Sequence, residues 1–511
     1  MKKISRTIEC LLLILGVALA GCGLGETLPA PPAPPPAGPN PTTPTTPPAA
    51  SSPSNLPSLL NCQQCHGDVH ADWLAGPHAL TQTDVADELA EERVAETPDE
   101  VLHGADPEDC IACHGPTAIL ANSGMSEVDT LSFFFTRTDG AFSADTSAVN
   151  TDDWPNVGCT ACHNVPADHP ATLPTLALYN SVAGKYAQMD NTSALCGQCH
   201  GDLRFADTDH LTYNAWAMSR HSVTQADVAD ELAAERDGQT PDEVLNGDDP
   251  ENCIACHAPT AVITNGRMSE EQALNYFFTT TDGHFSASTT PVHGDEWPDV
   301  ACNACHDPMN PGTFSYFNSS TKKHEPMASS SELCGQCHGN LRFPDTDHLS
   351  YNVIAGTGGM GIPDLHTMPG ATCTDCHMFV SDVDGSNSSM FHGHTFAISV
   401  QEDGGQATLS CIKCHPNTFN TTDAVDFIIN LWRQNFEDLD ATAQTNVADA
   451  EAALVGVNDP ALQAKLQEAQ FNLGFAESDE SGGFHNHVYL MALLNDANGK
   501  ALDILTALGG P

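Results

Sequence analysis

The pentapeptide Cys-x-x-Cys-His occurs nine times in this chain of 511 residues and contains 18 of its 20 cysteines. Any fold must therefore hold nine copies of one local arrangement, in which two thiols and an imidazole lie within five residues. We number these motifs 1 to 9 in chain order. They are Cys62/Cys65/His66, Cys110/Cys113/His114, Cys159/Cys162/His163, Cys196/Cys199/His200, Cys253/Cys256/His257, Cys302/Cys305/His306, Cys334/Cys337/His338, Cys373/Cys376/His377 and Cys411/Cys414/His415.

The spacing inside each motif is typical of a covalently attached haem. Two thiols three residues apart reach the two vinyl groups of one porphyrin, and the histidine that follows can bind the iron from the proximal side. Paired zinc knuckles or redox disulfides would also use Cys-x-x-Cys, but neither explains the histidine. The motifs therefore predict nine covalently bound haem c groups.

The composition agrees with an interior filled largely by these groups. Phe, Trp and Tyr make up only 6% of the chain, so we expect the haems to dominate the core. The formal net charge of −50 excludes a nucleic-acid binder, because phosphate would be repelled. Asp-Thr-Asp at residues 207–209 and 345–347 could ligate calcium, with solvated turns as the alternative.

The first 57 residues are expected to export and tether the chain. Residues 1–21 have the pattern of a signal peptide, whose apolar run from Leu11 to Ala20 is too short to span a bilayer. Cys22 follows Leu-Ala-Gly and is expected to carry lipid, although an ordinary cleaved signal is the alternative. Residues 22–57 are rich in Pro and Thr and predict a semi-rigid stalk. Gly23, where inner-membrane lipoproteins carry aspartate, favours the outer membrane, on its periplasmic or cell-surface face.

The chain repeats itself, which predicts its domain organisation. Three-haem units are expected at residues 58–195, 196–333 and 334–418, the third with a shortened middle, followed by C-terminal helices at 419–511. The text "TQTDVADELAEER" of the first unit recurs as "TQADVADELAAER" in the second. Helical spacing in these stretches and after Cys414 predicts a mostly α fold with much irregular loop, a haem-dominated core, a threefold repeat and a C-terminal helical hairpin broken near Gly456 and at Gly482.

The chain has 24 histidines, so 15 remain outside the motifs for the distal side of nine irons. Recurrence at matching repeat positions favours His78 with His221, His210 with His348, and His169 with His324. His366 and His70 lie close to motifs, His392 or His394 could serve a haem of the third unit, and His485 opens a C-terminal helix. Every haem could therefore have two histidine ligands, and a ligand could come from a distant unit.

The chain resembles the multihaem cytochrome c superfamily, which includes pentahaem nitrite reductases, octahaem hydroxylamine and tetrathionate enzymes, and decahaem electron conduits. The resemblance covers residues 62–511 and is carried by the nine motifs, by the Cys-x-x-Cys-His-Gly…Trp-x-x-x-x-His pattern from Cys62 to His78, and by the terminal helices with His485 and Tyr489. No motif ends in lysine, the mark of the catalytic nitrite-reducing haem, and the three-haem repeat departs from those enzymes.

Three functions are compatible with these features. The first is electron transfer through low-potential, mostly bis-histidine haems in extracytoplasmic anaerobic respiration. The donor or acceptor would be a partner cytochrome, a quinol-oxidising membrane complex or an extracellular metal oxide. The second is an enzyme that reduces nitrite, hydroxylamine or tetrathionate, which requires an open haem and a nearby cation such as Arg204, Arg220 or Arg342. The third is a subunit of a conductive filament. The sequence identifies no catalytic residue.

Overall fold

The computed structural model describes residues 62–509, apart from 106–109, 117–124, 151–155, 167, 173, 182, 190, 206–207, 209, 248–249, 251, 262–267, 294–298, 344–345, 347, 369, 379–392, 397–399, 403–404, 408, 419–420 and 480. The predicted signal peptide, Cys22 and the stalk lie outside these residues, as does His392. None of the helices in the described ranges is both long and apolar enough to cross a lipid bilayer.

Each motif is built on about one helical turn. In motif 1, for example, the backbone N–H of His66 donates to the carbonyl of Cys62 at 2.7 Å. This turn places both thiols and the imidazole on a short rigid segment. The turns are η1 (Cys62–Gln64), α5 (Cys110–His114), α8 (Cys159–Cys162), α9 (Thr192–Cys196), α13 (Cys253–His257), α16 (Cys302–Cys305), α17 (Ser330–Cys334), α19 (Cys373–His377) and α20 (Leu409–Cys414).

Between motifs 1 and 6 the same short elements occur twice, once in each of the first two predicted units. Thr97 and Thr240 begin matching helices with capping boxes and proline in the first turn, as the sequence predicts. The elements are α2 (Gly67–Ala75), η2 (Pro77–Ala79), α3 (Thr81–Glu91), α4 (Pro98–His103) and α7 (Glu127–Phe134), then α10 (Thr212–Ala217), η4 (Arg220–Ser222), α11 (Thr224–Glu235), α12 (Pro241–Asn246) and α15 (Glu270–Phe277). The extension to a threefold repeat stays a prediction.

Each of these two units has a compact apolar cluster of its own. Val85 and Leu89 of α3 pack with Phe134 and Phe142 in the first, and Val228 and Leu232 with Phe277 and Phe285 in the second. One motif cysteine lies inside each cluster: Cys110 is 7% exposed and Cys253 is 6% exposed. The described interior therefore contains apolar side chains as well as motif residues.

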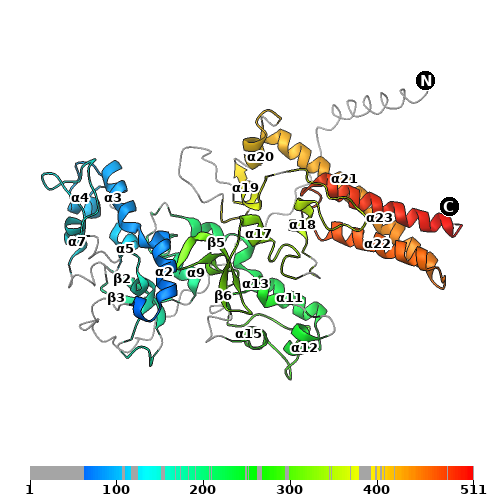
Figure 1. Ribbon diagram of the computed structural model, residues 1–511, viewed down its shortest axis with the longest axis horizontal. Helices are drawn as coiled ribbons and strands as arrows, with labels where there is room; N and C mark the ends of the chain where they lie inside the picture. Colours follow the sequence, from blue (N-terminus) through cyan, green and yellow to red (C-terminus); the bar gives the residue numbers. More distant parts are fainter. Residues whose placement is uncertain are drawn as a thin grey trace. The chain divides into compact units, whose positions relative to one another are not determined.

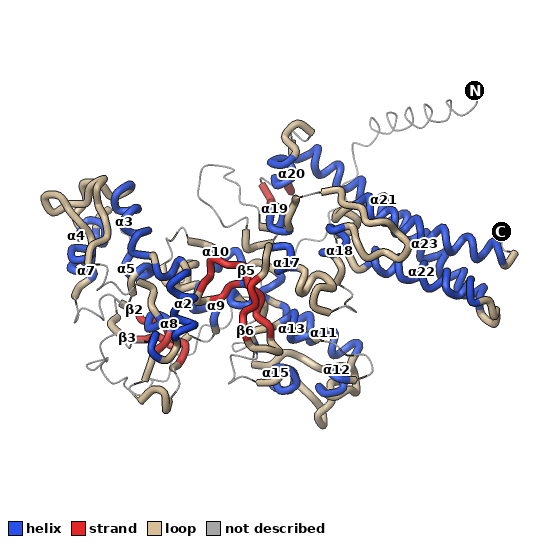
Figure 2. The backbone as a smooth tube through the Cα atoms, viewed as in Figure 1, coloured by secondary structure: helices blue, strands red, loops and turns tan. Residues whose placement is uncertain are grey.

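Small antiparallel sheets, which the sequence analysis did not anticipate, lie among the helices (Figure 2). The first two begin at the histidines of motifs 3 and 6, and they have the strand orders β1-β2-β3 and β4-β5-β6. Their central strands β2 and β5 are half-buried against helices of neighbouring motifs. The strands are β1 (His163–Asn164), β2 (Thr175–Asn180), β3 (Lys185–Gln188), β4 (His306–Asp307), β5 (Asn310–Asn318), β6 (Lys323–Pro326), β7 (Val400–Glu402) and β8 (Gly405–Ala407).

The C-terminal part contains three long helices, whereas we expected a hairpin. The helices α21 (Thr422–Leu454), α22 (Pro460–Glu477) and α23 (His487–Ala507) pack on one another (Figure 1). The chain breaks where the sequence predicts, with Gly456, Gly482 and Gly483 at positive φ. The short helix α18 (Ser350–Ala355) joins the same apolar cluster through Val353. The fold is therefore mostly helical with small sheets.

Candidate haem-binding sites

Within the described residues, six motif histidines each face a histidine from outside the motifs. A metal–imidazole bond is about 2 Å long, so two rings on opposite sides of one iron have centroids roughly 6 Å apart. The observed separations fit this value, and all six partners are among the residues that the sequence favours. The pairs are His66 with His169 at 6.1 Å, His200 with His78 at 6.2 Å, His114 with His210 at 6.5 Å, His338 with His221 at 6.1 Å, His306 with His394 at 6.0 Å and His377 with His485 at 5.8 Å.

Desolvation keeps several of these imidazoles neutral, the form that can bind a metal. It lowers the pKa of His200 to about 4, of His338 to about 3 and of His221 to about 4. Neighbouring histidines lower each of these pKa values further. A cluster of desolvated nitrogen donors is costly unless the donors have partners, and an iron between two rings would provide one.

Hydrogen bonds at Nδ1 orient several of these rings. The Nδ1 of His306 lies 3.1 Å from the carbonyl oxygen of Pro311, and that of His377 lies 2.9 Å from the carbonyl of Phe396. The Nδ1 of His485 lies 2.7 Å from a carboxylate oxygen of Asp479, whose side chain is fully buried. A proton held at Nδ1 leaves Nε2 as the metal-binding nitrogen. Sequence reasoning missed Asp479, because a single acidic residue six positions before a histidine has no distinctive pattern.

The duplication of the first two units points to a seventh pair. The imidazoles of His78, His210 and His114 lie close enough to His200 to lower its pKa. His338, at the equivalent position of the next unit, has the equivalent neighbours His221, His348 and His257. Since His114 faces His210, the repeat indicates that His257 of motif 5 faces His348.

Other predicted distal ligands are placed elsewhere. The ring of His70 contacts Trp73, and His324 lies on β6 with its Nδ1 3.1 Å from the Ser315 hydroxyl. His366 is exposed, and none of these three rings faces a motif histidine in the described ranges. His394, which we expected opposite a haem of the third unit, instead faces His306 of the second. The loop that follows motif 8 thus reaches back to motif 6, which the order along the chain does not reveal.

Motif 3 differs from the paired motifs. Burial lowers the pKa of His163, as it does for several of the paired histidines. In the described part of the chain, however, no histidine ring lies opposite His163. Its counterpart in the second unit, His306, does have such a partner.

Three further predicted haem-binding residues, Cys113, Cys199 and His415, lie on motif turns and are not members of the histidine pairs. The thiols of Cys113 in motif 2 and Cys199 in motif 4 are half-buried, and the backbone N–H of Cys199 donates to the carbonyl of Cys196 at 3.1 Å. The imidazole of His415 in motif 9 is exposed, although its backbone N–H closes the usual turn on the carbonyl of Cys411 at 2.8 Å. The local turn is therefore as expected at all three positions. Haem attachment at Cys113 and Cys199 and iron binding by His415 stay predictions from the motif.

The two repeated arginines bind protein groups. The guanidinium of Arg204 donates to the carbonyl of Ala112 at 3.0 Å and lies over the ring of Phe205. That of Arg342 donates to the hydroxyl of Tyr316 and lies over the ring of Phe343. Both side chains therefore join separate parts of the chain, and neither is presented as a free cation for a substrate oxyanion.

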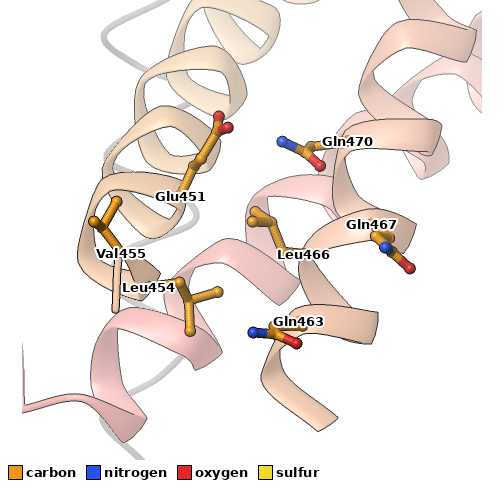
Figure 3. A pocket seen from close by; sticks show the side chains of 7 residues that line it. All are labelled: Glu451, Leu454, Val455, Gln463, Leu466, Gln467 and Gln470. Atoms are coloured by element: carbon orange, nitrogen blue, oxygen red, sulfur yellow. The ribbon is translucent and has the colours of Figure 1, made fainter. Parts of the chain in front are cut away.

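No calcium site is found in the described ranges, where no group of three acidic, cysteine or histidine residues could hold a metal ion. Asp207, Asp209, Asp345 and Asp347 of the two Asp-Thr-Asp turns lie outside those ranges. A hollow of about 300 Å³ lies between α21 and α22 (Figure 3). Its lining contains no histidine or cysteine, so it cannot ligate haem iron. The lining residues are Glu451, Leu454, Val455, Gln463, Leu466, Gln467 and Gln470.

Comparison with known protein families agrees with the haem-binding motifs and the facing histidines. The family model of cytochrome c552 matches residues 361–509, and that of cytochrome c554 and c-prime matches residues 61–132 and again 195–276. No curated protein matches the chain.

Among solved structures, the chain has partial similarity to three cytochromes. The outer cell wall cytochrome OcwA is 17% identical over 86% of this chain and 98% of its own, with a TM-score of 0.45. An undecahaem cytochrome from the S-layer of Carboxydothermus ferrireducens is 17% identical over 74% of this chain and 53% of its own, with a TM-score of 0.37. A cytochrome c nitrite reductase from Desulfovibrio desulfuricans is 18% identical over 57% of this chain and 74% of its own, with a TM-score of 0.36. The two family matches, together with the motifs and the facing histidines, identify this chain as a multihaem c-type cytochrome.

Proposed function

We propose that this cytochrome is an electron-transfer protein that holds nine haem c groups, most of them between two histidines. The observation that carries the proposal is the set of six histidine pairs at 5.8 to 6.5 Å. A bound haem c supplies a one-electron couple. With imidazoles on both sides of the iron no coordination position is left for a substrate, so the site can exchange electrons but cannot bind a small molecule at the metal.

The protein's own charges favour low reduction potentials. The formal net charge of −50 and the two neutral nitrogen donors at each pair stabilise the more positive, oxidised iron. At motif 8 the buried carboxylate of Asp479 makes His485 a stronger donor. Low potentials suit anaerobic respiration, with a reduced cytochrome or a quinol-oxidising complex as donor and a partner cytochrome or an extracellular metal oxide as acceptor.

We place the protein outside the cytoplasm, attached by lipid on Cys22 to the outer membrane. The support is the apolar run of the signal peptide, the Leu-Ala-Gly-Cys sequence at its end and the Pro-rich stalk. Globomycin, which blocks lipoprotein signal peptidase, should cause the precursor to accumulate. A mature mass that lacks the acyl chains would contradict this part of the proposal.

Motif 3 favours one alternative, a haem-based reductase of a small nitrogen or sulfur oxyanion. His163 faces no histidine among the described residues, so the distal side of this haem could accept a substrate. A full enzymatic site would also need a cation or proton donor on that side. Arg204 and Arg342 do not serve this role, because their guanidinium groups bind the protein.

Electron paramagnetic resonance of the oxidised holoprotein distinguishes the two functions. An electron-transfer protein gives low-spin ferric signals that are unchanged by nitrite, hydroxylamine or tetrathionate. The reductase would be established instead by a high-spin signal of one iron per molecule that one of these compounds abolishes or shifts, if the protein also reduces that compound. A variant with both Cys159→Ala and Cys162→Ala, which cannot attach the haem of motif 3, should remove that high-spin signal if it comes from this motif.

A further inference from the structure

The cysteines of different motifs contact one another in a recurring pattern. The sulfur atoms of Cys196 and Cys302, in motifs 4 and 6, lie against each other, and the Sγ of Cys302 is 3.5 Å from the hydroxyl of Ser193. The same contact joins Cys334 to Cys373 in motifs 7 and 8. It also joins Cys62 to Cys159 in motifs 1 and 3. Each motif that opens a unit therefore lies directly against a later motif of that unit.

Serine and tryptophan side chains maintain these contacts. Ser193, three residues before Cys196, accepts from the backbone N–H of Cys302 at 3.3 Å, and Ser331, three residues before Cys334, accepts from that of Cys373 at 3.1 Å. The indole N–H of Trp73 ties α2, which follows motif 1, to the turn before motif 3, with 3.0 Å to the carbonyl of Val157. Trp216 makes the equivalent bond for motifs 4 and 6.

The central strands connect one unit to the next. The helices α8 of motif 3 and α9 of motif 4 both pack on β2. In the same way α16 of motif 6 and α17 of motif 7 both pack on β5. At the C-terminal end α19 of motif 8 contacts α20 of motif 9.

Motifs 2 and 5 are joined to motifs 4 and 7 through the arginines that follow those two motifs. Arg204, which follows motif 4, donates to the carbonyl of Ala112 inside motif 2. Arg342, which follows motif 7, donates to the Tyr316 hydroxyl, and that hydroxyl donates to the carbonyl of Ala255 inside motif 5 at 2.6 Å. The thiols of Cys337 and Cys256 also contact each other, which links motif 7 to motif 5 a second time.

Exposure of the cysteines separates the ends of this network from its interior. Of the 18 motif cysteines, Cys65 of motif 1 and Cys414 of motif 9 are the exposed ones. Cys110 of motif 2 and Cys253 of motif 5 are instead the buried ones, each inside an apolar cluster. Motifs 1 and 9 can thus meet another protein, whereas one of the two attachment sites is enclosed in each of motifs 2 and 5.

We propose that electrons travel along the line of motifs 1, 3, 4, 6, 7, 8 and 9, with motifs 2 and 5 as side branches attached at motifs 4 and 7. This wiring rests on the proposed electron-transfer function. Each step moves one electron, so that one iron is oxidised, the next is reduced and no bond is made or broken. One end of the line takes an electron from a reduced one-electron carrier such as a cytochrome, and the other end gives it to an oxidised one-electron acceptor.

The wiring changes the interpretation of the third unit. Cys373 contacts Cys334 as Cys302 contacts Cys196, and Ser331 corresponds to Ser193. Motif 8 therefore occupies the place of a third motif, although it is second in its unit by sequence. The third unit lacks the counterpart of motifs 2 and 5, which explains why the line has two branches.

The order of the irons is tested by locating them in crystals of the holoprotein from anomalous scattering at the iron edge. The expected nearest neighbours are 1 with 3, 3 with 4, 4 with 6, 6 with 7, 7 with 8 and 8 with 9, while iron 2 neighbours 4 and iron 5 neighbours 7. An iron 2 or 5 that lies between two members of the line, or a gap between irons 3 and 4, would overturn the wiring. This result does not depend on whether the resonance spectrum favours electron transfer or catalysis.

A variant tests whether motif 6 lies on the route. His394→Met should replace a nitrogen ligand by a thioether and raise the potential of that haem, creating an electron trap on the line. With holoprotein held on a gold electrode through Asp68→Cys beside motif 1, we expect the current to a soluble acceptor to fall at least tenfold. His103→Met, at a histidine whose side chain is 66% exposed, is the matched control. If the mass of each variant shows nine haems and the two currents are equal, the route is refuted. If His394→Met loses a haem, the iron positions in the crystals decide whether the route is correct.

Discussion

Asp299 is an acidic residue at a position where the first unit has an amide, and this difference should make the second unit sensitive to pH. Asn156 and Asp299 are 7% and 6% exposed, and both have positive φ. Each accepts hydrogen bonds at the start of a helix of its own unit: Asp299 from the Thr224 hydroxyl at 3.4 Å and from the Gln225 N–H at 3.3 Å. The Thr224 hydroxyl is also 2.5 Å from the carbonyl of His257.

Burial is the main reason why the pKa of Asp299 rises from its ordinary value of 3.8 to about 7, and Asp227 adds to the rise. The two hydrogen-bond donors act in the opposite direction but do not compensate. Between pH 4 and 7 the folded protein keeps a proton that the unfolded chain has released, so its free energy of unfolding falls as pH rises. Three pKa units correspond to about 4 kcal/mol. Since water can enter around the ionised group, we expect about 2–4 kcal/mol.

Asp299→Asn should remove this pH dependence, because the amide can accept the same hydrogen bonds as Asn156 does. Guanidinium unfolding of the holoprotein should show little difference between variant and wild type at pH 4. At pH 8 the variant should be more stable by about 2–4 kcal/mol. The reciprocal Asn156→Asp should introduce the same loss into the first unit. The reasoning would be refuted if variant and wild type differed in stability by the same amount at both pH values. It would also be refuted if the wild type at pH 5 showed no infrared band of a protonated carboxyl group that disappears in Asp299→Asn.

Three further substitutions have expected outcomes. Tyr489→Phe should lower the free energy of unfolding by about 1–3 kcal/mol, since the Gly359 N–H donates to the hydroxyl of the buried Tyr489 at 2.7 Å and would lose its acceptor; thermal unfolding measures this, and an unchanged midpoint would contradict it. Thr97→Ala should cost about 1 kcal/mol through the lost helix cap, and hydrogen exchange in α4 should increase accordingly. Asp479→Asn should raise the reduction potential of one haem by the equivalent of about 1 kcal/mol, because His485 loses a charged hydrogen-bond partner; a spectroelectrochemical titration in which no potential rises would argue against His485 as a ligand.

Features that depend on local spacing could be predicted from the sequence. The capped helices at Thr97 and Thr240 follow from Thr-Pro-Asp-Glu, in which each residue stabilises the first turn. The six facing histidines were all among the predicted ligands. Recurrence at matching repeat positions indicated His78, His221, His210 and His169, whereas His394 and His485 were predicted from their places in the third unit and at the start of a C-terminal helix. The breaks at Gly456 and Gly482 also lie where glycine permits a positive φ.

Features that depend on distant pairing could not be predicted. The strands β2 and β5 are short, and their apolar residues, such as Tyr179 and Phe317, are also compatible with a buried helix segment. Nothing in the spacing after motif 8 indicates that His394 returns to motif 6. Nor does the sequence distinguish motif 8 as the counterpart of motif 6, because the cysteine contact that shows this joins residues far apart in the chain.

The histidine pairs also bear on whether the predicted units could exist separately. His66 and His169 lie within one predicted unit, but the other five observed pairs join different ones. A fragment of residues 196–333 would leave His200 without His78 and His306 without His394. His210 and His221 would also lose His114 and His338, so four imidazoles of the fragment would lack their partners, which is costly whether or not haem is attached. Haem ligation therefore joins the repeats to one another, and we expect the units to require their neighbours to complete their iron sites even though each has its own apolar cluster.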